Sequence, residues 1–149
     1  EIAPGTIQRM SAGTGIRHSE FNASKDEPVH LLQIWIRPDR AGHTPGYESR
    51  TFSESERRGR LCVLASPDGR DGSARVHQDA LMLSALLAKG DTVEHQLAPG
   101  RGAWVQVARG RVVVNGAPLE QGDGAIVEEE QRISIEATED AEAIIFDLA

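Results

Sequence analysis

The sequence predicts an all-β fold on three observations. Glycine and proline are frequent, with 15 and 7 residues among 149, and they recur along the whole chain. The segments between them are short and rich in Val, Ile and Leu, which favours strands. Turn signals such as NGAP, QGDG and SPDG separate these segments. Many short strands joined by tight turns are typical of a β-sandwich or a β-barrel.

Each apolar segment is predicted as one strand. In chain order these strands are 29–36 (VHLLQIWI), 60–66 (RLCVLAS), 80–88 (ALMLSALLA), 92–97 (TVEHQL), 103–108 (AWVQVA), 111–116 (RVVVNG), 124–129 (GAIVEE), 131–137 (QRISIEA) and 142–148 (EAIIFDL). Alanine and leucine give 80–88 some helical propensity. Its place among other strands favours a strand, because context outweighs propensity.

One short helix is predicted in the stretch FSESERRGR. Ser53 is a suitable N-cap, and Glu56 follows at the spacing of a capping box. Gly59 stands where a helix can end.

The chain is predicted to divide into three parts. Residues 37–52 are the best linker, because they contain two prolines, two glycines and no apolar period. Residues 1–36 are then too few to close a barrel, whereas 53–149 can form a complete domain. The sequence has no initiator Met and begins in what looks like a turn between strands, so we expect either that residues were removed or that a longer protein was cut here.

Composition excludes several functional classes. The formal net charge is −7 at pH 7, and no stretch concentrates Lys and Arg enough to neutralise phosphates, which argues against nucleic-acid binding. No run approaches the ~20 apolar residues of a membrane span. The single cysteine, Cys62, lies in an apolar stretch and predicts a buried thiol in a reducing compartment. We therefore expect a soluble, cytoplasmic protein.

A histidine and a glutamate stand two residues apart in the stretch SAGTGIRHSEFN. In an extended strand His18 and Glu20 would face the same side, with Ser19 and Phe21 on the other. An imidazole nitrogen and a carboxylate oxygen suit a divalent first-row metal. The same spacing is also typical of a solvated polar strand face, so spacing alone leaves both interpretations open.

The surrounding residues carry a resemblance to a known family. Gly5, Gly13 and Gly15, then His18 and Asn22, resemble the second conserved motif of the cupin barrel. Ser11 departs from it by standing where proline is common. More narrowly, the chain resembles the pirin family of two-domain cupins through QRMSAGTGIRHSEFN, HLLQIWIRP, PGYESRTF, SPDGRDGS, HQDA and VNGAPLEQGDGAIV, in this order.

The resemblance implies a cupin double-stranded β-helix fold. Residues 1–36 would be the C-terminal part of an N-terminal cupin, and 53–149 a complete C-terminal cupin. In the family the first cupin holds a metal through an earlier His-x-His pair and a later histidine and glutamate, which His18 and Glu20 match. The implied ion is Fe(II), with Ni, Cu, Zn, Mn and Co as alternatives.

The activity implied by the resemblance is a metal-dependent dioxygenation of flavonols such as quercetin, with ring opening by O₂. Glu20 would serve as a weak ligand or proton acceptor. With half of the site, the 149-residue chain itself is expected to be inactive and to hold metal substoichiometrically. The alternative is a non-enzymatic regulatory or interaction module that responds to metal or redox state. Exposed strand edges predict self-association.

The C-terminal domain is predicted to be metal-free. When its sequence is set against the same cupin pattern, Ile133 falls in the histidine position and Ala103 where a glutamate should stand. His95 lies nearby, but a lone histidine is more often a surface or satisfied core residue. We expect a packed interior of Ile, Val, Leu and Trp.

Structural roles are expected for the remaining histidines. His30 opens a predicted strand and could neighbour the metal, although a core or surface place is commoner. His43 is expected to be solvated in the linker. In the stretch HQDA, 77–80, His and Asp are expected to fix a turn through side-chain hydrogen bonds to the backbone. Trp35 and Trp104 are expected in the core, and 128–132 (EEEQR) at a solvated turn.

Overall fold

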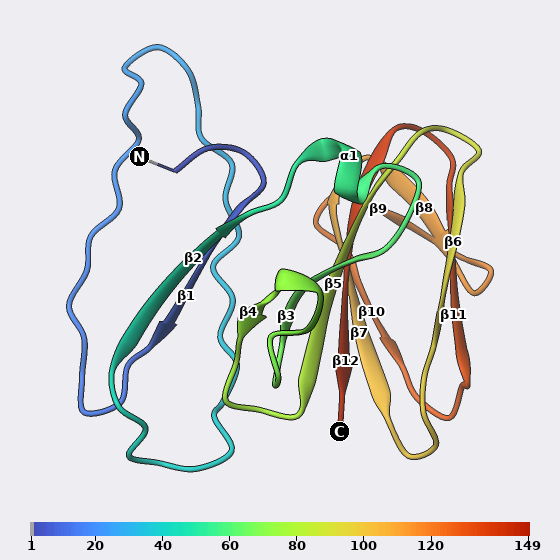
Figure 1. The fold of residues 1–149 in the computed structure, drawn as a ribbon. Coiled ribbons are helices and arrows are strands. Elements are labelled where there is room, and N and C mark those ends of the chain that lie inside the picture. The colour runs from blue at the N-terminus through green and yellow to red at the C-terminus, as the bar shows by residue number, and fades with distance from the viewer. Residues whose placement is uncertain (1) are drawn as a thin grey trace.

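A computed structural model describes residues 2–149, and they form three β-layers (Figure 1). The predicted all-β class is confirmed. The strands are β1 (Thr6–Ser11), β2 (Gly46–Thr51), β3 (Cys62–Ser66), β4 (Ala74–Arg75), β5 (Ala80–Leu87), β6 (Thr92–Gln96), β7 (Gly102–Arg109), β8 (Arg111–Val114), β9 (Ala117–Glu120), β10 (Gly124–Val127), β11 (Arg132–Ala137) and β12 (Ala141–Leu148). One helix, α1 (Glu54–Arg57), and a 3₁₀ turn at Arg70–Gly72 complete the elements.

Two sheets face each other across the main core. The middle layer has six strands in the order β10-β7-β12-β5-β3-β4, and the layer beside it has four in the order β6-β11-β8-β9. Alternate side chains of each sheet point into the space between them. Val105 and Ile145 from the first sheet and Ile133 and Ile135 from the second are fully buried there.

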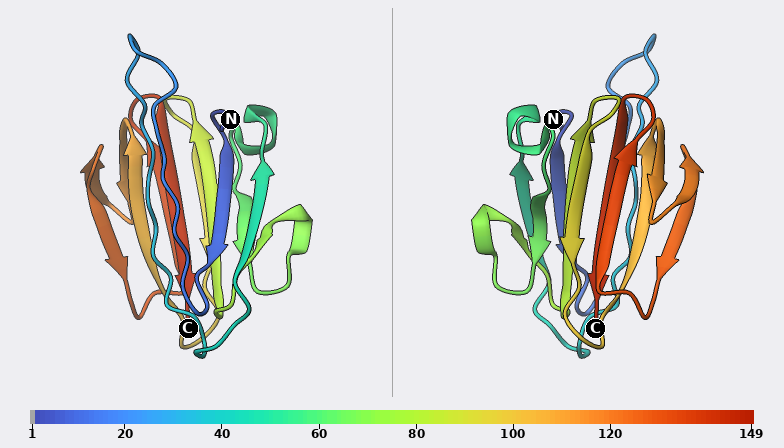
Figure 2. Two further views of the ribbon diagram at one scale, coloured as in Figure 1. Left: turned by 90° about the vertical axis from the view of Figure 1, so that its left-hand side faces the viewer. Right: turned by 90° about the vertical axis from the view of Figure 1, so that its right-hand side faces the viewer.

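The β1–β2 hairpin forms the third layer, on the outer face of the six-stranded sheet (Figures 1 and 2). Its strands pair antiparallel from Thr6 opposite Thr51 to Ser11 opposite Gly46. Ile7 packs on a second buried cluster: Phe52, Leu64, Ala65, Ala74, Met82 and Ile144. The hairpin is thereby attached to the sheet by apolar contacts.

Most of the predicted strands are confirmed within two residues of their ends. The segment 80–88 is the strand β5 and not a helix, and its inward side chains Leu83, Ala85 and Leu87 lie in the main core. The predicted helix is confirmed as α1, where the Glu56 carboxylate accepts a 2.7 Å hydrogen bond from the backbone N–H of Ser53.

Two predictions about the N-terminal part are wrong. The segment 29–36 is extended but pairs with no strand among residues 2–149, so its backbone lacks the ladder that defines a strand. Residues 6–11, expected in a turn, form β1. Residues 46–51, which lie within the predicted linker, form β2. The division into 1–36, 37–52 and 53–149 stays a prediction.

Both tryptophans lie outside the main core, contrary to prediction. Trp35 is 88% exposed, because the unpaired segment that carries it leaves its side chain uncovered. Trp104 is partly exposed and points outward from β7, where a β-carbon at Gly124 would overlap its ring. Cys62 is only half-buried, and that burial raises the pKa of its thiol. Glu128, Glu129 and Glu130 are exposed, as expected.

Candidate metal centre

The segment between β1 and β2, residues 12–45, carries the predicted metal ligands and runs beyond one end of the layers (Figure 2). It starts at a tight crossing. Gly13 has a φ of +54°, and a β-carbon there would overlap the carbonyl oxygen of His43 and lie 2.8 Å from Cδ of Pro45. Only glycine accepts that conformation and that contact together. The crossing fixes the path of the chain toward His18.

His18 and Glu20 lie close together on this segment. Nδ1 of His18 is 4.0 Å from Oε1 of Glu20, and the two side chains are 40% and 37% exposed. The sequence predicted that they lie on a strand. They do not, because the segment has no ladder partner among residues 2–149. The distance is too long for a hydrogen bond, so neither donor atom is used by the other.

The pair fits a divalent first-row ion as a partial ligand set. Neighbouring ligands at about 2.1 Å from an ion lie about 3.0–3.4 Å apart in octahedral or tetrahedral geometry, so the observed 4.0 Å has to close by about 0.6–1.0 Å for both side chains to bind one ion. Imidazole and carboxylate are donors that such ions accept. Within residues 2–149 no group of three or more His, Cys, Asp or Glu side chains converges, so the described chain offers two ligands at this place.

The other histidines take different roles. His30 Nδ1 lies 3.5 Å from Nε of Arg109. His43, expected to be solvated, has a side chain only 12% exposed, because its ring stacks on His77. In the stretch HQDA the side-chain bonds to backbone come from Gln78 and not from His77.

A network of polar side chains lies inside the C-terminal domain. The residues that bond to His95 in it were not predicted from the sequence. His95 Nε2 donates to Oδ2 of the buried Asp147 at 2.7 Å. Arg101 also donates to Asp147 and reaches Asp79 at 2.9 Å. His95 is therefore a satisfied, partly buried histidine, as expected, and Ile133 beside it in the ladder is fully buried.

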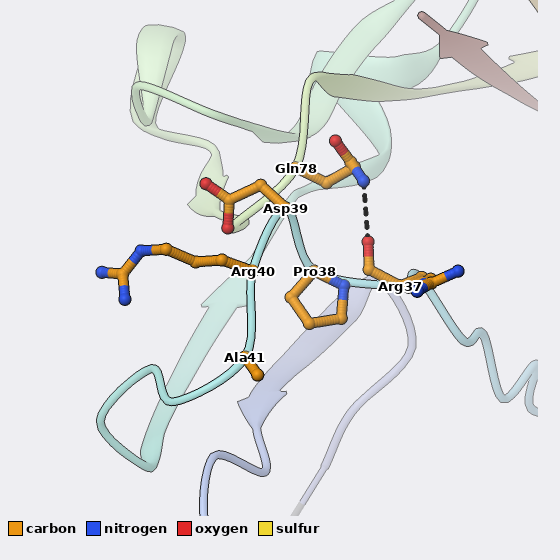
Figure 3. A pocket seen from close by; sticks show the side chains of 6 residues that line it. All are labelled: Arg37, Pro38, Asp39, Arg40, Ala41 and Gln78. Atoms are coloured by element: carbon orange, nitrogen blue, oxygen red, sulfur yellow. Dashed lines mark hydrogen bonds between the residues drawn. The ribbon is translucent and has the colours of Figure 1, made fainter.

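Two shallow hollows adjoin the turn 37–41. The larger, about 460 Å³, is lined by Arg37, Pro38, Asp39, Arg40, Ala41 and Gln78. Figure 3 shows Arg37 and Arg40 extending in opposite directions, with Gln78 Nε2 bonded to the Arg37 carbonyl at 2.9 Å. The charged groups do not converge on one point. This hollow therefore lacks the arrangement that a catalytic site requires.

Two family matches cover most of the chain. Residues 63–148 match the family described as quercetinase C-terminal cupin domain, and residues 1–36 match the family described as pirin. The chain belongs to the pirin family. The cupin fold predicted from the sequence is confirmed with it.

Relatives of this pirin are similar over nearly its full sequence. Quercetin 2,3-dioxygenase of Escherichia coli is 47% identical over 148 residues, which are 99% of this chain and 63% of the relative. A pirin-like protein of Caulobacter vibrioides is 40% identical over 146 residues, which are 97% of this chain and 62% of the relative. The chain thus spans less than two thirds of the length of these relatives.

Solved pirin structures share the fold described above. The crystal structure of bacterial pirin YhhW from Escherichia coli in complex with nickel(II) has a TM-score of 0.88 and 47% identity, covering 97% of this chain and 61% of that one. Another YhhW structure has a TM-score of 0.91 and 45% identity over 99% of this chain and 62% of that one. Because these matches leave only 1–3% of the chain uncovered, they extend over the N-terminal part of the chain.

Proposed function

We propose that His18 and Glu20 supply half of a divalent-metal centre in a pirin that opens the ring of flavonols such as quercetin with O₂. The observation that carries the proposal is that the two side chains lie 4.0 Å apart on an exposed segment. At that distance they form no hydrogen bond with each other. Family membership supports it, as do a relative named quercetin 2,3-dioxygenase and a related structure that holds nickel(II). Fe(II) is the ion we favour.

The centre needs more ligands than these two. Open catalytic sites of such ions commonly use at least three protein ligands. The 149-residue sequence contains no His-x-His pair. We propose that such a pair completes the site and belongs to the part of the relatives that this chain does not match.

Each of the two side chains has its own role in the proposed reaction. When bound, the ion supplies Lewis-acid polarisation of the flavonol hydroxyl and a path for electron transfer to O₂. Neutral His18 donates a ring lone pair and fixes the position of the centre. Glu20 accepts the hydroxyl proton of the flavonol on its carboxylate, which leaves an electron-rich anion for reaction with O₂. The exposure of both side chains leaves room for a substrate to approach.

The experiment compares variants of a protein that carries this sequence together with any natural sequence before it. His18→Ala and Glu20→Gln are made beside the control Glu27→Gln, which removes an exposed carboxylate from the same segment. Quercetin turnover is followed by its absorbance, and metal per chain is measured in the same samples. We expect turnover in wild type and control, and its loss in both site variants.

The outcomes separate the enzyme from the regulatory module. Loss of turnover together with loss of metal in His18→Ala supports the dioxygenase. Stoichiometric metal in the wild type without quercetin turnover contradicts it and favours a metal-responsive regulator. Retained turnover in both site variants would place the chemistry elsewhere.

A further inference from the structure

Two imidazoles from distant parts of the sequence are stacked between the N-terminal segment and the C-terminal cupin. The rings of His43 and His77 have centroids 3.9 Å apart and planes inclined by 11°. His43 belongs to the turn that precedes β2, whereas His77 lies just before β5. Because two imidazoles in contact cannot both carry a positive charge without repulsion, this contact is sensitive to protonation.

Hydrogen bonds around the stack attach the turn to the cupin. The backbone N–H of Asp39 donates to the His77 carbonyl at 2.7 Å, and Gln78 Nε2 donates to the Arg37 carbonyl at 2.9 Å. His43 Nε2 donates to the Asp39 carboxylate at 2.5 Å, and this bond lowers the pKa of Asp39. The turn 37–43 is therefore held by a hydrogen bond within itself and by two hydrogen bonds to the residues just before β5.

The charges that face His77 are mostly positive. Besides His43 they are Arg9 from β1 and Arg75 from β4, with the Asp39 carboxylate opposing them. Burial first, and these cations next, lower the pKa of His77 from its ordinary 6.5. A hollow of about 350 Å³ borders His77, so protons reach the ring from solvent.

We propose that the His43–His77 stack is a pH-sensitive latch that holds the turn 37–43 on the C-terminal cupin and releases it when His77 becomes protonated. The latch adjoins the metal-ligand segment directly, because the carbonyl of His43 contacts Gly13, five residues before His18. Release therefore loosens the path of the chain toward His18 and Glu20. The release itself does not depend on the metal proposal.

The direction of the pH effect follows from the two states of His77. With the latch open, its pKa returns to about 6.5. With the latch closed the pKa is lower, so the closed form binds fewer protons in the interval between the two values. The stability that His77 contributes to the closed latch is therefore fully present only above about pH 6.5. It weakens as the pH falls toward the lowered pKa, and below that value no further change occurs.

Hydrogen exchange of the Asp39 amide tests the latch in the 149-residue chain. Its protection, corrected for the intrinsic pH dependence of exchange, is measured by NMR from about pH 8 to 5. We expect protection to fall in the wild type and to stay constant in His77→Phe, which keeps an aromatic stack but cannot be charged. The control His30→Phe removes a histidine that contacts Arg109 instead and should behave as wild type.

Two results would overturn the latch. One is wild-type protection of Asp39 that does not change with pH, and the other is a His77→Phe chain that loses protection as the wild type does. Should His77→Phe fail to fold, the titration of His77 in the wild type tests the latch instead. The His77 resonances must then titrate below pH 6.5, over the same interval in which the Asp39 amide loses protection, and a mismatch contradicts the proposal.

Discussion

His95 and Asp147 join the two sheets of the C-terminal cupin through a 2.7 Å hydrogen bond in its interior. His95 belongs to β6 and Asp147 to β12 of the facing sheet, and the aspartate side chain is only 5% exposed. Arg101 donates to the same carboxylate. A buried charge with two donors is stable only while both donors remain.

Removing that charge should destabilise the chain strongly. Asp147→Asn keeps the shape but leaves Arg101 without its buried counter-ion, so we expect a loss of about 3 kcal/mol in the free energy of unfolding. Urea denaturation measures it. The control Glu120→Gln breaks an exposed pair with Arg111 and should cost under about 0.5 kcal/mol. Equal losses in the two variants would mean that the network contributes nothing beyond a surface pair.

Ile133 stands in the C-terminal cupin where the cupin pattern has a metal-ligating histidine. The side chain is fully buried between the sheets. Ile133→Ala should lower the free energy of unfolding by about 2–5 kcal/mol, and Ile133→Val by about 0.5–1.5 kcal/mol, because the cavity left by alanine is larger. Thermal unfolding of both variants checks the order. An alanine variant as stable as the valine variant is inconsistent with a packed interior.

Gly13 should tolerate no side chain. Gly13→Ala adds the cost of a positive φ, about 1–2 kcal/mol, to an overlap with the His43 carbonyl worth about 1–3 kcal/mol. Gly42 is the matched control, because its φ is +80° and a β-carbon there meets open space. Gly42→Ala should show the first cost alone in denaturant titrations. Similar losses at both positions would argue against the close contact of Gly13 with His43.

The sequence predicted the C-terminal strands well because their signal is local. In 131–137 the alternate residues Ile133, Ile135 and Ala137 are apolar, and they are the ones buried in the core. The β1–β2 hairpin was missed because TIQRMS and GYESRT are mixed in polarity and pair across a long separation in sequence. Pairing of that kind leaves no pattern within either strand.

The candidate site was predictable in part for the same reason. His18 and Glu20 stand two residues apart, so their proximity follows from local geometry, and the structure has them 4.0 Å apart. His43 and His77 meet only through the fold. The stretch HQDA marked His77, but nothing in the sequence indicated the second ring.

Exposed apolar side chains on the N-terminal segment predict self-association of the 149-residue chain. Phe21 and Trp35 are 86% and 88% exposed, and such groups promote association when they gather on one surface. Sedimentation velocity should show concentration-dependent association that the double variant Phe21→Ser, Trp35→Ser reduces. The control Ile126→Ser removes an exposed apolar residue from β10 instead. Association unchanged in the double variant would assign it to another surface.

The metal content of matched chains tests the central claim most directly. In a protein that carries this sequence together with any natural sequence before it, we predict about one divalent ion per chain for wild type and Glu27→Gln. Loss of a ligand typically costs far more affinity than the 10–100-fold of an outer-shell change, so His18→Ala should retain only a small fraction of the metal after dialysis. Glu20→Gln, which removes the weaker ligand, should retain less metal than the wild type. The 149-residue chain alone should hold metal substoichiometrically. Full metal occupancy in His18→Ala, or one tightly held ion in the 149-residue chain, would contradict the assignment of these two residues as half of the centre.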